Sequence, residues 1–332
     1  MTPSMSTLGF IVIAFMLVMY VMLDGFDLGV ATIVPALARS DRERAAAISA
    51  IGPFWNGNEV WLIAAGAALF ALFPTAYASA FSGFYLPFIM VLWMLMFRGI
   101  AVELRDHIDS ELWHEFWDAA FSSSSILLIV LFGVALGNLL RGVPLDAGGY
   151  FLGTFAFLLN PYAALVGLFA LATLMQHGAL FLALRVDGGF GLRGREAVRA
   201  LWWSAAALYV MATVATFSAH PPAAPSWIFA LPVLSLGALV GVRWSVAAGN
   251  DALAFVASCG FIATLLAAAA ATIYPYLLPA FPAGRGGISI FAAAPSNTSI
   301  GTALVITLAG IALLALYAPA VWRRMAVKVR VE

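Results

Sequence analysis

Long apolar runs separated by short polar connections make up almost the whole chain. Nine runs have about 20 residues or more, the length that a helix needs to cross the hydrocarbon core of a bilayer. They cover residues 8–37, 54–73, 77–98, 119–140, 154–184, 198–218, 226–247, 252–279 and 299–322. The pattern predicts an all-α integral membrane protein with nine transmembrane helices, and a single transmembrane domain over residues 1–332, because nothing is left over for a soluble domain.

Three connections have patterns of their own. Residues 99–118 carry apolar side chains at helical spacing between charges, which predicts an amphipathic surface helix or an extension of the third span. Residues 185–197 contain a GxGxxG pattern. In dinucleotide-binding proteins this pattern follows a β-strand, but here a predicted transmembrane helix precedes it. We therefore expect a flexible loop and no dinucleotide site. Residues 274–299 are rich in proline, glycine and aromatics and predict an irregular segment that closes one end of the bundle.

Composition agrees with a membrane protein, and the placement of charge orients it. The chain is 64% apolar and 10% charged, against roughly 25% charged residues in soluble domains. With nine spans, all basic residues except Arg141 and Arg285 fall on one side. Short cytoplasmic loops retain Lys and Arg, so the C-terminus is predicted in the cytoplasm and the N-terminus outside. The net charge is zero, which gives no field to attract nucleic acid.

Two simple alternatives are excluded by the residues present. The first apolar run is too long for a signal peptide, lacks a basic start and contains two acids. Cys259 is the only cysteine, which rules out a disulfide within the chain or a cysteine-rich metal site. We therefore predict no metal bound by this chain.

Three carboxylic acids lie inside predicted spans, while the other thirteen fall in connections, span ends or the C-terminus. They are Asp24 and Asp27 in the first span and Glu59 in the second. A charge near mid-membrane costs about 2.5 to 3.5 kcal/mol on insertion scales and usually faces a bundle interior. Asp24 and Asp27 share a helix face and lie roughly 15 to 20 Å from the cytoplasmic end, and Glu59 about 9 Å from it. The acids could form a file that passes protons inward.

A structural interpretation stays open beside the proton path. Gly25 and Gly29 flank Asp27 with the small-residue spacing that lets membrane helices approach closely. The acids would then only hold two helices together by hydrogen bonds. Arg98 is a candidate counter-ion or an interface anchor. His177 is the only histidine within a span, so this chain cannot supply a bis-histidine haem site, although His177 could be one ligand or a structural hydrogen-bonding group.

Several longer stretches resemble a known family. They are "LDGFDLGV" (23–30), the run from "GPFWNGNEVW" to "SGFY" (52–85), "FRGIAVELR" (97–105), "GNLLRGVP" (137–144), "LLNPYAAL" (158–165) and "TIYPYLLP" (272–279). They are similar to subunit II of the cytochrome bd-type quinol oxidases, in the same order along essentially the whole chain. The form of residues 97–105 leans toward the cyanide-insensitive branch of that family.

The resemblance implies a partner and a shared reaction. It implies a haem-poor or haem-free scaffold, not catalytic alone, that is pseudosymmetric with a subunit I carrying the quinol site, two haems b and a haem d or b. The complex, in the bacterial inner membrane, would oxidise quinol, reduce oxygen to water with cytoplasmic protons and so generate a proton motive force. Some members hold a structural quinone in subunit II, and some complexes include a small single-helix accessory subunit.

The resemblance also assigns residues to the proton path. Asp24 and Asp27 match the acids of the first helix, and Trp55 matches a tryptophan at the start of the second helix. Asn56 stands where well-known members have an aspartate, and asparagine cannot titrate, so Glu59 would take over that role. Protons would pass Trp55, Asn56 and Glu59 and then Asp27 and Asp24. From the pattern alone, a proton-coupled secondary transporter is the alternative, although no inverted repeat is evident.

Overall fold

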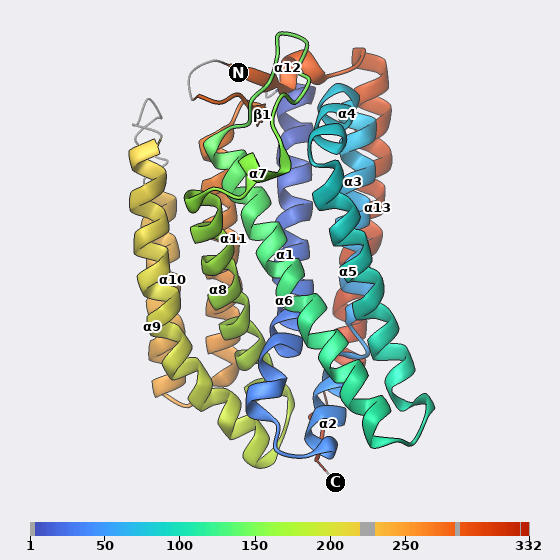
Figure 1. Ribbon diagram of the computed structural model, residues 1–332, viewed down its shortest axis with the longest axis vertical. Coiled ribbons are helices and arrows are strands. Elements are labelled where there is room, and N and C mark those ends of the chain that lie inside the picture. Colours follow the sequence, from blue (N-terminus) through green and yellow to red (C-terminus); the bar gives the residue numbers. More distant parts are fainter. Residues whose placement is uncertain (1–3, 220–229, 283–285, 326, 332) are drawn as a thin grey trace.

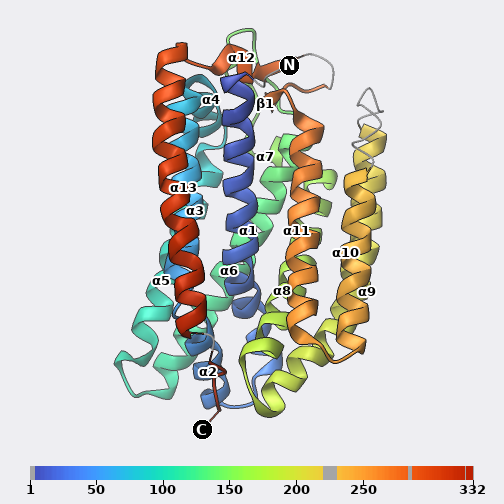
Figure 2. The same ribbon diagram turned by 180° about the vertical axis from the view of Figure 1, so that it is seen from behind.

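The computed structural model describes residues 4–219, 230–282, 286–325 and 327–331. Its longer helices stand side by side in one bundle (Figures 1 and 2). The helices are α1 (Met5–Leu37), α2 (Asp41–Ile51), α3 (Trp55–Leu72), α4 (Pro74–Gly83), α5 (Tyr85–Leu104), η1 (Arg105–His107), α6 (Glu111–Arg141), α7 (Phe155–Leu158), α8 (Pro161–Arg185), α9 (Gly188–Ala219), α10 (Ala230–Ala247), α11 (Asp251–Ile273), α12 (Ile290–Ala293) and α13 (Asn297–Met325).

Eight helices in the described part of the chain are long and apolar enough to cross a membrane, namely α1, α5 with η1, α6, α8, α9, α10, α11 and α13. The second predicted span, 54–73, forms α3, which has 18 residues and begins with the polar run "WNGNE". These residues lower the mean hydropathy of the helix, and α3 is not among the eight. The count of nine spans therefore stays a prediction.

The structure corrects several predicted boundaries. The third predicted span, 77–98, is interrupted at Phe84, so α4 is a separate short helix and α5 extends to Leu104. Residues 185–197 are not a flexible loop, because α9 begins at Gly188. The predicted span 252–279 ends earlier, with α11 at Ile273. Residues 220–229, which include His220 and the start of the predicted span 226–247, lie outside the described residues.

The connection at 274–299 has regular structure where an irregular segment was expected. Strand β1 (Tyr276–Pro279) pairs antiparallel with β2 (Gly287–Ser289), and Tyr276 lies opposite Ser289. Helix α12 follows β2, and the backbone N–H of Val143 donates to the carbonyl of Pro279. The segment lies at the end of the bundle near the N-terminus, as predicted for a closing segment (Figures 1 and 2).

Helix α1 runs through the middle of the bundle and packs against α3, α6, α8 and α11. Its contact with α8 is close because glycines meet. A Cβ on Gly29 would overlap the backbone of Leu174 and Gly178, and a Cβ on Gly178 would overlap the backbone of Gly29. The Gly25–Gly29 spacing thus serves a tight contact between α1 and α8. The first two predicted spans are not brought together by these glycines.

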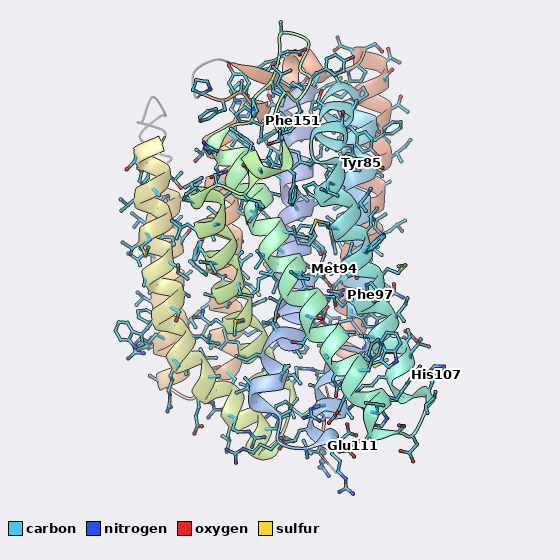
Figure 3. The ribbon with its side chains drawn as sticks, viewed as in Figure 1. Tyr85, Met94, Phe97, His107, Glu111 and Phe151 are labelled. Carbon is cyan, nitrogen blue, oxygen red and sulfur yellow. The ribbon has the colours of Figure 1, made fainter. Side chains whose placement is uncertain are left out.

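We call the opposite end of the bundle, where α2, η1 and the C-terminus lie, the basic end (Figures 1 and 2). Figure 3 places His107 and Glu111 at this end and Tyr85 toward the other. The buried guanidinium of Arg105 holds the elements together here. Its Nε donates to Asp118 at 2.7 Å, its Nη1 donates to Asp106 at 3.0 Å, and its Nη2 contacts Asp41.

A second ion pair fixes α2 to the start of α9. Arg193 donates from Nε to the carbonyl of Leu37 at 3.0 Å, and its Nη2 lies 2.5 Å from Glu43 Oε2. The backbone N–H of Arg39 donates to the same oxygen at 2.6 Å. Burial raises the pKa of the Glu43 carboxyl, but the Arg39 N–H and the Arg193 guanidinium outweigh it, so the pKa lies below its ordinary value.

Candidate functional site

Three charged side chains from three helices meet inside the bundle. Arg98 of α5 donates two hydrogen bonds to Asp24 of α1, from Nη1 to Oδ2 at 2.9 Å and from Nη2 to Oδ1 at 2.7 Å. The same Nη2 donates to Glu59 Oε1 of α3 at 2.6 Å. Asp24 and Arg98 are buried, and the Glu59 side chain is 20% exposed. Two carboxylates therefore share one guanidinium, and we call Asp24, Arg98 and Glu59 the ionic triad.

Asp27 has a neutral partner instead of a cation. Its Oδ2 accepts a hydrogen bond from Asn58 Nδ2 at 2.7 Å, and Asn58 also donates to the carbonyl of Leu23 at 3.1 Å. Asp27 is 1% exposed, and its Oδ1 is buried without a hydrogen-bond partner. An unpaired carboxylate oxygen in a low-dielectric interior is costly. A bound proton or an ordered water removes that cost, so this carboxyl is suited to proton exchange.

The local sequence explains why the two aspartates differ. Three residues of α-helix turn the chain by 300°, so Asp24 and Asp27 share a broad face of α1 but point to different neighbours. On α3 the adjacent residues Asn58 and Glu59 also differ in direction, which sends Asn58 to Asp27 and Glu59 to Arg98. The sequence predicted one file of acids. The structure shows two separate groups that lie side by side.

The other predicted site residues lie around these groups. Trp55 begins α3 and is partly exposed, and a Cβ on Gly99 of α5 would lie 3.6 Å from the Trp55 ring. Asn56 is exposed, and no hydrogen bond joins its side chain to the acids. His177 is buried. Its Nδ1 lies 2.9 Å from the Ser258 hydroxyl, and its Nε2 lies 3.0 Å from the carbonyl of Met22.

Two residues of the site were missed in the sequence. Asn58 is 6% exposed and contacts Asp27 directly, and its signal was its place beside Glu59 in the polar start of an apolar helix. Tyr20 lies one helical turn before Asp24 and is 3% exposed, and its hydroxyl is buried without a hydrogen-bond partner. Nothing in the pattern distinguished this tyrosine from the interfacial aromatic residues of other spans.

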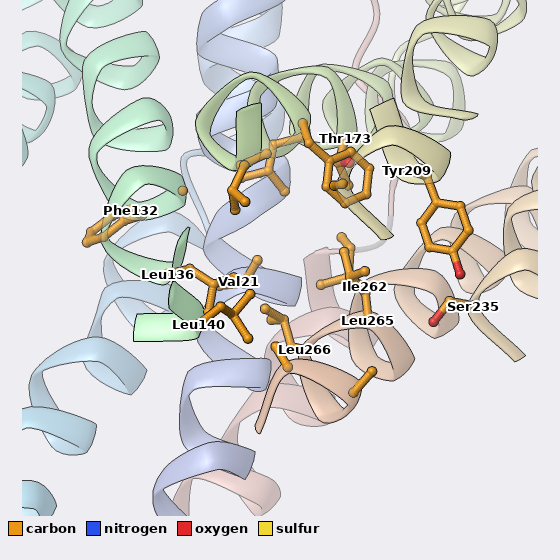
Figure 4. Close-up of a pocket in the computed structure, with 18 of the residues that line it drawn as sticks. Val21, Phe132, Leu136, Leu140, Thr173, Tyr209, Ser235, Ile262, Leu265 and Leu266 are labelled. Atoms are coloured by element: carbon orange, nitrogen blue, oxygen red, sulfur yellow. The ribbon is translucent and has the colours of Figure 1, made fainter. Parts of the chain in front are cut away.

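A cavity of about 180 Å³ lies next to the site, between α1, α6, α8, α9, α10 and α11. Figure 4 shows its lining, with Val21, Phe132, Leu136 and Leu266 among the apolar side chains and Thr173 in the wall. Tyr20 also lines the cavity. The Thr173 hydroxyl, like that of Tyr20, is buried without a partner. A mostly apolar cavity with a few unpaired hydroxyl groups fits an apolar ligand that carries hydrogen-bond acceptors.

In the described ranges, no group of three or more His, Cys, Asp and Glu side chains is placed to hold a metal ion. The site instead brings titratable side chains together. Three carboxyl groups, one guanidinium and one amide come together within the membrane-spanning part of the bundle. Such buried ionisable groups mark ion and proton pathways in membrane proteins.

Comparisons with known proteins identify relatives of the whole chain. The family model described as "Cytochrome bd terminal oxidase subunit II" matches residues 5–325. The chain is 30% identical to "Cytochrome bd-I ubiquinol oxidase subunit 2" of Escherichia coli K12, over 92% of this chain and 90% of that protein. It is 38% identical to "Cytochrome bd ubiquinol oxidase subunit 2" of Bacillus subtilis 168, over 58% and 57%.

A solved structure has the same fold. The chain aligns with the bd oxidase from Geobacillus thermodenitrificans with a TM-score of 0.79, over 97% of each chain and with 19% sequence identity. The arrangement of helices is therefore one that a bd oxidase chain adopts.

Proposed function

The chain belongs to the cytochrome bd terminal oxidase subunit II family, and we propose that within such an oxidase it conducts cytoplasmic protons toward the oxygen-reducing site of its partner. Family membership makes it a component of an oxidoreductase complex with a subunit I, and a multi-pass protein of the bacterial inner membrane. The resemblance stated from the sequence is thereby confirmed. The secondary-transporter alternative is not favoured, because no transporter is among the relatives described above.

The proposal is carried by the buried groups around Asp27. The Asp27 carboxyl has no cationic partner among the described residues, and it lies beside a triad in which two carboxylates share one guanidinium. Protons can move by exchange among these carboxyl groups without moving a charge alone through the apolar core, which would be costly. The triad's excess negative charge also favours arrival of a proton at this depth.

The direction of flow follows from the predicted sidedness. We place the basic end in the cytoplasm, because short cytoplasmic loops retain Lys and Arg. Glu59 is the most exposed member of the ionic triad and receives protons there, near Trp55 and Asn56. From Glu59 the proton passes to Asp27 and then to Asp24, which Arg98 holds beside Glu59. Quinol oxidation and oxygen reduction to water take place in subunit I, which gains the protons delivered by this chain.

The haems of the complex are assigned to subunit I. His177, the histidine in a span, has both ring nitrogens engaged with Ser258 and Met22, which leaves neither free for iron. This supports a haem-free scaffold that is pseudosymmetric with its partner and not catalytic alone. A small single-helix accessory subunit and membership of the cyanide-insensitive branch remain predictions from the resemblance.

A structural quinone is proposed for the cavity beside α1. The cavity has about 180 Å³, an apolar lining and the unpaired hydroxyl of Thr173, which can donate to a quinone carbonyl. Solvent extraction of the purified complex should then yield a quinone that Thr173→Leu reduces. Equal quinone content in Thr173→Leu and in the exposed control Thr302→Val would contradict this assignment.

The proton path is tested by removing one titratable group at a time. Asp24→Asn, Asp27→Asn and Glu59→Gln keep the size of each side chain but cannot carry a proton. We expect each to slow quinol oxidation by the assembled complex by about 10-fold or more, as is typical when a proton-transfer group is lost. Oxygen consumption measures turnover, and the haem spectrum of the purified complex measures assembly.

Asp109→Asn is the matched control, since Asp109 is exposed at the basic end and joins no ion pair. It should leave turnover unchanged. If all three variants assembled and turned over like the control, the acids would only hold helices together, and the structural interpretation would replace the proton path.

A further inference from the structure

A narrow crevice between α3 and α13 ends beside Asn58. It holds about 20 Å³ and is lined by Gly57 and Asn58 of α3, Tyr317 and Trp322 of α13, and Leu23 of α1 among others. One water needs a space of roughly 10 to 15 Å³ on this scale, together with polar partners. The crevice is therefore large enough for one water molecule. No member of the ionic triad lines it.

Glycine at position 57 creates this space. A Cβ there would lie 3.2 Å from Cε1 of Tyr317 and 3.8 Å from its hydroxyl. The tyrosine ring therefore lies directly over the α3 backbone at Gly57. Tyr317 is 54% exposed, so the crevice reaches the surface of the chain at this residue.

One polar atom of the Asn58 side chain is free to accept a hydrogen bond in the crevice. Its Nδ2 donates to Asp27 Oδ2 and to the carbonyl of Leu23, which uses both amide hydrogens. Since both partners are acceptors, the amide nitrogen must face them. Its Oδ1 remains as an acceptor for a donor in the crevice. A water there can donate to Asn58 Oδ1 and also exchange hydrogen bonds with the Tyr317 hydroxyl.

We propose that this crevice is a water-binding site that gives Asp27 its own access to the basic end, with Tyr317 at its outer limit and Asn58 as the gate. The inference rests on the proton role proposed above. Asparagine does not titrate, so Asn58 itself carries no proton. When its side chain turns away from Asp27, the water takes its place. The water accepts a proton from the medium at the basic end as it passes one of its own protons to Asp27 Oδ2, so it stays neutral.

Water access is measured first, by a method that does not depend on turnover. In a Cys259→Ala background, which removes the single cysteine, Tyr317→Cys is compared with Leu316→Cys. Leu316 is 74% exposed and adjacent on the same helix but does not line the crevice. The assembled complex in inside-out vesicles is treated with a water-soluble, membrane-impermeant methanethiosulfonate. The mass of the isolated chain reports labelling.

We expect Tyr317→Cys to be labelled several-fold faster than Leu316→Cys, because a thiol reacts as thiolate and needs water. Gly57→Ala, combined with Tyr317→Cys, should slow labelling by filling the crevice. Equal labelling of the two cysteines, or labelling that Gly57→Ala does not change, would overturn the water site.

Turnover tests whether the site serves Asp27. Gly57→Ala should slow quinol oxidation several-fold at unchanged KM for quinol and unchanged haem spectrum. Gly66→Ala, on the same helix where a Cβ meets nothing within 4 Å, is the control. If Asp27→Asn slows turnover and Gly57→Ala does not, the crevice is rejected as a proton route and the proposed function stands. If Asp27→Asn has no effect, the proposed function itself fails.

Discussion

Arg98 illustrates how one residue serves both the fold and the proposed chemistry. In the described part of the chain it is the one cation that touches the acids inside the bundle, and it contacts Asp24 and Glu59 at once. The sequence placed Arg98 near these acids and left open whether it paired with them. The bidentate geometry with Asp24 is one that a lysine cannot reproduce.

Removing Arg98 alone should be costly, and removing the whole triad should not. Arg98→Met leaves the buried Asp24 and the partly buried Glu59 without a cation, and breaking a buried pair typically costs about 3 to 5 kcal/mol. We expect the complex to assemble poorly, as measured by haem absorbance per membrane protein. Adding Asp24→Asn and Glu59→Gln removes the stranded charges and should restore assembly while turnover stays low.

The triple variant separates the two roles of the triad. Assembly that remains poor in the triple variant would show that Arg98 supports the fold by packing alone. Restored turnover together with restored assembly would show that the triad is structural.

At the scale of elements, α2 depends on charges that the sequence showed without showing their partners. Glu43 lies in the first turn of α2, after the N-cap Ser40. Its carboxylate accepts a hydrogen bond from the backbone N–H of Arg39, just before α2, and forms an ion pair with Arg193 of α9. The spacing predicted polar residues at the cytoplasmic surface. It could not predict that α9 begins at Gly188 and brings Arg193 to α2, because glycines in a polar connection usually indicate a loop.

Acid should weaken this contact. Because the folded-state pKa of Glu43 is lowered, its carboxylate stabilises the fold above the ordinary pKa of about 4.3, and that stability is lost as pH falls through the lower folded value. Glu43→Gln should lower the thermal unfolding midpoint of the purified complex at pH 7, by an amount equivalent to at most about 1 kcal/mol.

The difference between wild type and Glu43→Gln should shrink as pH falls below about 4.3. Asp109→Asn, which removes an exposed and unpaired acid, should show no difference at either pH. A Glu43→Gln effect that stayed constant across this range would show that charge at Glu43 is irrelevant to docking of α2.

For the whole molecule, the apolar pattern predicted the helical membrane fold, and the resemblance of several longer stretches predicted the family. Both left the internal contacts open. Eight predicted spans recur as helices of spanning length, since runs of apolar residues have one low-energy state in a bilayer. The local sequence of a helix did not show which neighbouring helix each of its faces contacts. The spacing of Gly25 and Gly29 predicts a close contact with another helix but does not say which one. Only the three-dimensional packing shows that it is α8.

The candidate site shows the same limit. Three acids in apolar segments were visible in the sequence because charges are rare there. Their division into the ionic triad and the Asp27–Asn58 pair depends on the rotation of α3 against α1, which residue spacing does not fix. Tyr317 and Gly57 come together from opposite ends of the chain, so no local pattern could join them.

The central claim is that Asp27 takes up protons from the cytoplasm for the oxygen reaction in subunit I. It is tested most directly by time-resolved proton uptake. The reduced, oriented complex reacts with oxygen, and a pH-sensitive dye in the medium at its basic end reports the protons taken up. Asp27→Asn should slow or abolish the uptake phase while the haem spectrum and the initial binding of oxygen stay normal. Proton uptake at the wild-type rate and extent in Asp27→Asn would contradict the account.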